Sequence, residues 1–145
     1  MSLKDDKEFI WHPLTQHQLH PGHIVIKKAK DAVLYDDSDN EYIDGIASWY
    51  TCMYGHCNPY ITRAVSAQMK NLDHVVFTGF THKPATRLAK SLMNILPQNQ
   101  QKIFFSDNGS TSVDVALKMA LQYHFNKGNK RNKIIAFQDG FHGDT

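Results

Sequence analysis

Two short polar stretches hold residue types that could bind an anion, contact a cofactor or substrate, or act as acid or base. In the first, residues 106–112, Gly109 is followed by hydroxyl side chains and then by an expected helix. Free N–H groups and the helix dipole make a helix N-terminus partly positive, and phosphate is the anion most often bound there. The stretch lacks the Gly-Lys-Ser/Thr of a Walker loop and the Gly-x-Gly-x-x-Gly of a dinucleotide loop. It is either a phosphate site or a strand–helix turn capped by serines, with no ligand.

The second stretch, residues 139–144, follows an expected strand and contains three candidate residues. Phe141 is interpreted either as a core residue or as a flat ring that lies on a flat cofactor. His142 is either an acid or base or a hydrogen-bonded structural histidine. Asp144 is either a carboxylate that contacts substrate or a cap for the next element.

Trp49 lies in a loop region between Gly45 and Gly55, where a tryptophan either belongs to the core or forms the wall of a ligand pocket. Cys52 and Cys57 are predicted to be buried structural thiols, because their spacing with the nearby histidine fits no standard metal site.

Four histidines near the N-terminus lie in a segment broken by proline and glycine, without cysteines at zinc-finger spacing. They are interpreted as turn and surface residues, and no metal site is predicted. The four are His12, His17, His20 and His23.

A strand–helix–strand unit is expected to position the two polar stretches. Residues 102–105 and 133–137 form short apolar runs, and the residues between them carry an apolar stripe at helical spacing that ends before Gly128. This order predicts a parallel strand pair with a helical crossover. Ligands bind beyond the carboxyl ends of such strands, so both stretches are expected to converge on one crevice.

The preceding residues predict a small antiparallel meander and two helices. The meander is expected at residues 24–26, 32–35 and 41–44, and the helices begin at Asn58-Pro59 and at His82-Lys83-Pro84. Residues 9–16 should form an extended or turn segment that docks on an apolar surface. The expected domains are residues 1–57, an N-terminal segment with the meander, and residues 58–145, the start of a larger ligand-binding domain.

Composition narrows the class of protein. The 145 residues are enough to bury a core, and the net charge of +2 points to neither nucleic acid nor an anionic membrane. No apolar run reaches the roughly 20 residues of a membrane span, and the first residues are too polar for a signal peptide. With two cysteines, we expect reduced thiols and a cytoplasmic location. The chain stops soon after an expected strand, which predicts a piece of a longer protein.

Several stretches together resemble the N-terminal third of a class III, fold type I, pyridoxal phosphate (PLP) aminotransferase. The resemblance implies an α/β fold, with a small-domain segment followed by the start of a large parallel or mixed-sheet domain. The stretches are Trp11-His12-Pro13-Leu14-Thr15, Asp44-Gly45 with Ser48-Trp49, residues 74–85, Asp107-Asn108-Gly109-Ser110, residues 115–123 and Gly140-Phe141-His142-Gly143-Asp144-Thr145.

The resemblance also implies roles for single residues. Gly109 and Ser110 would hold the cofactor phosphate, and Phe141 would stack on the pyridine ring and border the substrate. Trp49 would line the substrate pocket, and Asp144 would lie near the substrates. Leu14 and Phe141 stand where tyrosine is common, so Leu14 would keep an apolar wall against the substrate but lack the hydroxyl.

Trp11-His12-Pro13 and residues 118–123 resemble most the family members of biotin synthesis. Those members are homodimers that move an amino group from S-adenosylmethionine to 8-amino-7-oxononanoate, giving 7,8-diaminononanoate by a ping-pong route. Two alternatives stay open: another class III enzyme acting on ω-amino acids or diamines, and a non-catalytic fragment that binds a phosphate ligand or a partner. In the family, the Schiff-base lysine and the carboxylate on the pyridinium nitrogen lie beyond residue 145, so no catalytic residue is expected here and the chain alone should be inactive.

Overall fold

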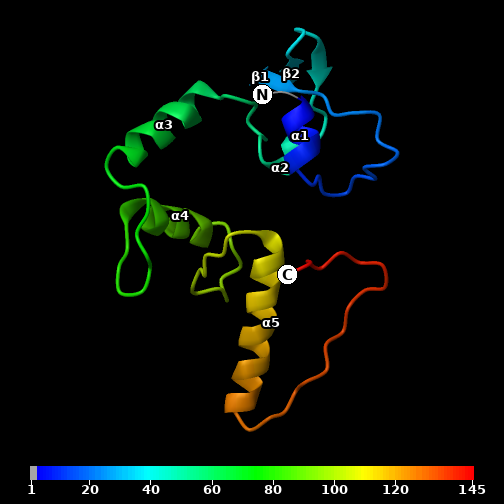
Figure 1. The fold of residues 1–145 in the computed structure, drawn as a ribbon. Helices are drawn as coiled ribbons and strands as arrows, with labels where there is room; N and C mark the ends of the chain where they lie inside the picture. Colours follow the sequence, from blue (N-terminus) through cyan, green and yellow to red (C-terminus); the bar gives the residue numbers. More distant parts are fainter. Residues whose placement is uncertain (1–2) are drawn as a thin grey trace. The chain divides into compact units, whose positions relative to one another are not determined.

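The computed structural model describes residues 3–145; residues 1–2, where the expected N-terminal segment begins, lie outside this range. The chain forms two compact units, one ending at Val75 and the other beginning at Val76 (Figure 1). The expected domain boundary after residue 57 remains a prediction.

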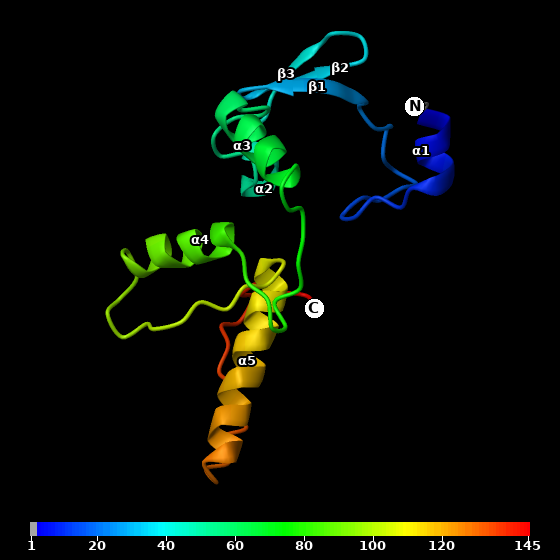
Figure 2. The same ribbon diagram turned by 90° about the vertical axis from the view of Figure 1, so that its left-hand side faces the viewer.

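A three-stranded antiparallel sheet lies in the first unit, and the predicted meander is confirmed. Strands β1 (Ile26–Lys30), β2 (Val33–Asp36) and β3 (Glu41–Ile43) pair in the order β1-β2-β3 (Figure 2). β1 begins at the last residue of the expected first strand, and its register with β2 shifts between Ile26 and Lys28.

The turn between β2 and β3 is organised by Asp36, a buried residue that is 6% exposed. Its carboxylate accepts hydrogen bonds from the N–H of Asn40 at 2.8 Å, the Asn40 amide at 2.9 Å and the Tyr42 hydroxyl at 3.0 Å. These bonds favour the ionised form, and Asn40 contributes most to lowering the pKa of Asp36.

Helices α3 (Pro59–Met69) and α4 (Lys83–Met93) begin where their caps predict. The Asn58 side chain accepts hydrogen bonds from the backbone at the start of α3, and the His82 ring does the same for α4. Two shorter elements, α1 (Leu3–Phe9) and α2 (Ala47–Tyr50), have no counterpart among the predicted helices.

The second unit contains the long helix α5 (Gly109–Asn126), which Gly128 follows in a left-handed conformation, as its place after the apolar stripe predicts. The hydroxyl residues Ser110, Thr111 and Ser112 do not supply the N-cap, so the expectation of a turn capped by serines is wrong. Asn108 is the N-cap, and the three hydroxyl residues lie inside the first turn of the helix.

The two strands predicted on either side of α5 are not formed. Residues 102–105 and 133–137 belong to no strand and share no backbone hydrogen bond. A strand requires a hydrogen-bonded neighbour, and here the apolar side chains of the second run face solvent; Ile135 is 99% exposed. The segment after α5 nevertheless runs back beside the helix, as the red end of the chain in Figure 1 shows.

The expectation of a sizeable core is also wrong for the described residues, because none of their hydrophobic side chains is buried. Trp11 is 90% exposed, so residues 9–16 are not docked on an apolar surface. Apolar side chains on the helices and extended segments therefore remain available for packing. None of the helices within residues 3–145 combines the length and the hydropathy needed to cross a bilayer.

Candidate functional site

A capping box fixes the start of α5. The Asn108 side chain accepts a hydrogen bond from the N–H of Thr111 at 2.9 Å, and the Thr111 hydroxyl accepts one from the N–H of Asn108 at 3.2 Å. The same hydroxyl donates to the Asp107 carboxylate, and this bond is the main reason that the pKa of Asp107 is lowered. The first turn of the helix is thereby held in place by its own polar side chains.

Two backbone donors at this helix end stay open. Within residues 3–145, the N–H groups of Gly109 and Ser110 have no hydrogen-bond acceptor. A Cβ built on Gly109 would meet no atom within 4 Å, so the space beside this backbone is free. Open N–H groups, a neighbouring hydroxyl and the positive end of the helix dipole are the donor set that a phosphate group requires.

The second polar stretch folds onto this helix end. The Ser110 hydroxyl donates to the Asp144 carboxylate at 3.0 Å, and the N–H of Asp144 lies 3.3 Å from the same hydroxyl oxygen. Gly143 has a φ of +118°, and a Cβ at this position would lie 2.9 Å from Ser110 Cα. The predicted convergence of the two stretches is therefore confirmed, although no strand pair brings them together.

Phe141 lies within this second stretch, and its side chain is 82% exposed, so its interpretation as a core residue is wrong. The chain bends tightly around Gly140, where an added Cβ would meet the His142 ring at 2.8 Å. The His142 ring stacks on Phe137, with ring centroids 6.5 Å apart, and Phe141 makes no ring contact within the described residues. The structure thus leaves the Phe141 ring free to contact a ligand.

Leu14 and Trp49 belong to the first unit. Both are exposed, Leu14 at 94% and Trp49 at 66%, so Trp49 is not a core residue. Both also adopt positive φ, and Trp49 lies in α2, where all four residues from Ala47 to Tyr50 have φ between 45° and 67°. α2 is therefore a left-handed turn, which L-residues other than glycine rarely form.

An interaction that the sequence did not reveal holds this left-handed turn. His56 Nε2 lies 2.7 Å from Asp44 Oδ2, and the Ser48 hydroxyl donates to the same oxygen at 2.8 Å. The hydrogen bond with His56 contributes most to lowering the pKa of Asp44, and the hydrogen bond from Ser48 contributes second. The backbone of His56 is itself paired with Asp31, which fixes the ring relative to the sheet. The four-residue spacing of Asp44 and Ser48 was the only sequence signal for this cluster.

The two cysteines beside this cluster are not buried structural thiols, so that prediction is wrong. Cys52 is half-buried and Cys57 is exposed; both are free. Cys57 has a φ of +53° in the turn that precedes α3, and such turns lie at the surface.

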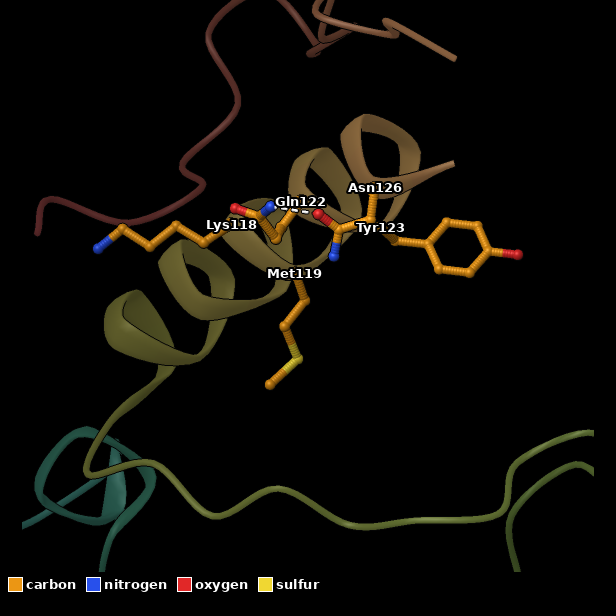
Figure 3. A pocket seen from close by; sticks show the side chains of 5 residues that line it. All are labelled: Lys118, Met119, Gln122, Tyr123 and Asn126. Atoms are coloured by element: carbon orange, nitrogen blue, oxygen red, sulfur yellow. Dashed lines mark hydrogen bonds between the residues drawn. The ribbon is translucent and has the colours of Figure 1, made fainter. Parts of the chain in front are cut away.

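A shallow hollow lies further along α5, lined by Lys118, Met119, Gln122, Tyr123 and Asn126 (Figure 3). All five residues come from one helix, and a hydrogen bond of 2.6 Å joins Gln122 to Asn126. A single helix face has no opposing wall to enclose a small ligand. The hollow therefore does not compete with the helix start as the candidate site.

The open helix start and the second loop folded onto it agree with two of the motifs that the sequence shares with a known family. The sequence model of the class III aminotransferases matches residues 14–145. The chain belongs to this family, and the resemblance of its motifs is confirmed.

Two curated relatives carry the same name. The adenosylmethionine-8-amino-7-oxononanoate aminotransferase of Synechococcus elongatus is 45% identical over 136 residues, which cover 94% of this chain and 32% of that protein. The Staphylococcus aureus enzyme of that name is 40% identical over 146 residues, which cover 97% of this chain and 32% of that protein. The chain thus spans about a third of the length of the curated relatives it matches.

Solved structures show the same fold. Adenosylmethionine-8-amino-7-oxononanoate aminotransferase from Methanocaldococcus jannaschii superimposes with a TM-score of 0.93 at 36% identity, covering 99% of this chain and 33% of that one. An omega transaminase from Pseudomonas jessenii, in complex with PMP, also superimposes with a TM-score of 0.93 at 28% identity. The match covers 100% of this chain and 33% of that one. The chain therefore has the α/β fold of this part of a class III aminotransferase.

Proposed function

We propose that the chain is the phosphate-holding part of a PLP-dependent aminotransferase. The observation that carries the proposal is the contact of Gly143 and Asp144 with Ser110, beside two open backbone donors. The N–H groups of Gly109 and Ser110, with the Ser110 hydroxyl, would hold the cofactor phosphate. The PMP complex of the omega transaminase supports this cofactor, because PMP and PLP are two forms of one group.

PLP, when bound, supplies the electron sink on which amino-group transfer depends. The residues of this chain position that group. The exposed ring of Phe141 lies just before Gly143 and Asp144, which contact Ser110, and it would cover one face of the pyridine ring. Asp144 would lie beside the substrates, while Leu14 and Trp49 would form apolar walls of the substrate pocket. No catalytic residue is assigned within the chain.

The proposed reaction transfers an amino group from S-adenosylmethionine to 8-amino-7-oxononanoate, giving 7,8-diaminononanoate for biotin synthesis. It is supported by relatives of that name at 36–45% identity. A cytoplasmic location and a homodimer are part of the same proposal.

A second candidate is another class III reaction, with an ω-amino acid or a diamine as donor. It is favoured by the omega transaminase, whose fold matches with a TM-score of 0.93. The apolar Leu14 and Phe141, which lack tyrosine hydroxyls, also leave the donor open. Turnover by the full-length protein with S-adenosylmethionine, compared with ω-amino acids and diamines, separates the two. PLP binding without turnover of any donor would instead support a non-catalytic binding protein.

The phosphate assignment is tested by PLP titration of the full-length protein, followed by the cofactor absorbance. Gly109→Val places a side chain in the space beside the open N–H groups, where an added Cβ meets no atom within 4 Å, and Ser110→Ala removes the hydroxyl. We expect at least a tenfold weaker PLP affinity for Gly109→Val and a smaller loss for Ser110→Ala. Gly45→Val is the matched control, since a Cβ at Gly45 also meets nothing within 4 Å. Unchanged PLP affinity in both variants would contradict the assignment.

A further inference from the structure

The segment between α1 and β1 brings side chains of α1 and of the N-terminal histidines together. Asp6 of α1 faces the rings of His12 and His23, and one ligand atom from each lies within 4.8 Å of the others. His12 Nε2 is 3.0 Å from Asp6 Oδ2, and His23 Nε2 is 4.0 Å from the same oxygen. All three side chains are partly buried.

Two further histidines support this cluster. The His20 ring stacks on His23 with centroids 4.5 Å apart, while its Nδ1 accepts a hydrogen bond from the N–H of Gly22. His17 Nε2 accepts a hydrogen bond of 3.1 Å from the backbone N–H of His12, which helps to fix the backbone at His12. Asp6 and the four histidines line one hollow of about 450 Å³.

We propose that Asp6, His12 and His23 form a binding site for a divalent first-row transition ion, with Zn²⁺ as the probe. Two imidazoles and a carboxylate are ligands that such ions prefer. In a tetrahedral zinc site with bonds of about 2.0 Å, ligand atoms are about 3.3 Å apart. The observed distances are 3.0 and 4.0 Å from the two histidines to Asp6, and all three ligand atoms lie within 4.8 Å of one another, so binding requires the side chains to close in by up to about 1.5 Å. The ion would replace the proton that His12 shares with Asp6, and a water molecule would complete the coordination.

The site would have a structural effect. Asp6 lies on α1, and His12 and His23 lie near the two ends of the loop that contains Leu14. A bound ion would tie this loop to α1 and limit the conformations that residues 12–23 can adopt. This inference does not depend on the proposed aminotransferase activity.

The test is calorimetric titration of the tag-free, full-length protein with Zn²⁺. We expect one saturable site and at least a tenfold loss of affinity in both His23→Gln and Asp6→Asn. Asp6→Asn keeps the shape of the side chain, so it tests the ligand role even if His23→Gln folds poorly. His74→Ala, which removes an exposed histidine outside the cluster, should bind Zn²⁺ as the parent does.

The visible spectrum of the Co²⁺-loaded protein provides a second measurement, because tetrahedral coordination changes the intensity and position of its bands. Loss of that spectrum in Asp6→Asn, with the far-UV circular dichroism unchanged, would support direct ligation. Absence of saturable Zn²⁺ binding would overturn the proposal, as would parent-like affinity in both variants. The second outcome would place the ion elsewhere, for example at Cys52 and Cys57.

Discussion

The Ser110 hydroxyl and the Asp144 carboxylate are joined by a hydrogen bond of 3.0 Å across 34 positions of the chain. The carboxylate therefore lies at the positive end of α5, where the proposed phosphate would bind. The single proton of the Ser110 hydroxyl cannot be donated to Asp144 and to a phosphate at once. Binding of the proposed phosphate therefore requires the Asp144 carboxylate, which also repels the phosphate, to release this hydroxyl, while the backbone of Gly143 stays against Ser110.

Asp144→Asn should accordingly strengthen binding of inorganic phosphate, by about fivefold for the loss of one repelling charge near the surface. The dissociation constant of phosphate, measured by calorimetry at low ionic strength, checks this. Asp139→Asn removes an equal charge from an exposed position of the same stretch and should have a much smaller effect. Equal gains in the two variants would show a general charge effect, and weaker binding in Asp144→Asn would show that Asp144 supports the site.

Gly143→Ala should separate the second stretch from the helix start. A Cβ there would lie 2.9 Å from Ser110 Cα, in a backbone conformation that alanine disfavours by about 1 kcal/mol or more. We expect PLP affinity to fall at least tenfold. Gly128→Ala is the matched control, because Gly128 also has positive φ but faces open space. Comparable PLP affinity in both variants would show that the close approach of the Gly143 backbone to Ser110 is not needed.

Asn108→Ala should destabilise the protein by about 1 kcal/mol, the usual loss on removing an N-cap side chain. The side chain bonds the N–H of Thr111 and is half of the capping box of α5. Urea unfolding followed by circular dichroism measures the loss. Asn132→Ala, at an exposed position that caps no helix, should leave the midpoint unchanged. An unchanged midpoint for Asn108→Ala would contradict the capping role.

The turn that contains Trp49 should loosen in acid. Asp44 has a pKa below its ordinary value of 3.8, chiefly because of His56. Its stabilising effect is therefore fully present above about pH 4 and is lost as the pH falls through the lowered pKa. In the 145-residue chain with Trp11→Phe, Trp49 is the remaining tryptophan, and its fluorescence should change over that acidic range.

Asp44→Asn in the same background should show the loosened fluorescence already at neutral pH and no further acidic transition. Asp31→Asn is the matched control, since Asp31 contacts His56 through its backbone. If the acidic transition persists in Asp44→Asn, the transition belongs to a titrating group other than Asp44.

Local signals predicted much of the fold. Asn58-Pro59 and the proline after His82 marked two helix starts because caps act within one turn, and alternating short apolar runs marked the meander. The convergence of residues 106–112 and 139–144 was predicted from a parallel strand pair that is not formed, and the hydrogen bond between Ser110 and Asp144 was not predicted. The prediction of strands on either side of α5 was wrong, because a strand depends on hydrogen-bonded neighbours that a local sequence pattern does not contain. The pair Asp44–His56 was missed because it depends on a left-handed turn formed without glycine.

That left-handed turn has a consequence for motion. Each of its four residues stays in a conformation that costs roughly 1–2 kcal/mol for an L-residue, held by the bonds of Ser48 and His56 to Asp44. Opening the turn breaks few bonds and relieves this strain, so its backbone amides should exchange with solvent faster than those of α3. A tryptophan on such a turn can change its orientation at little cost, which would let one pocket wall adapt to substrates of different shape.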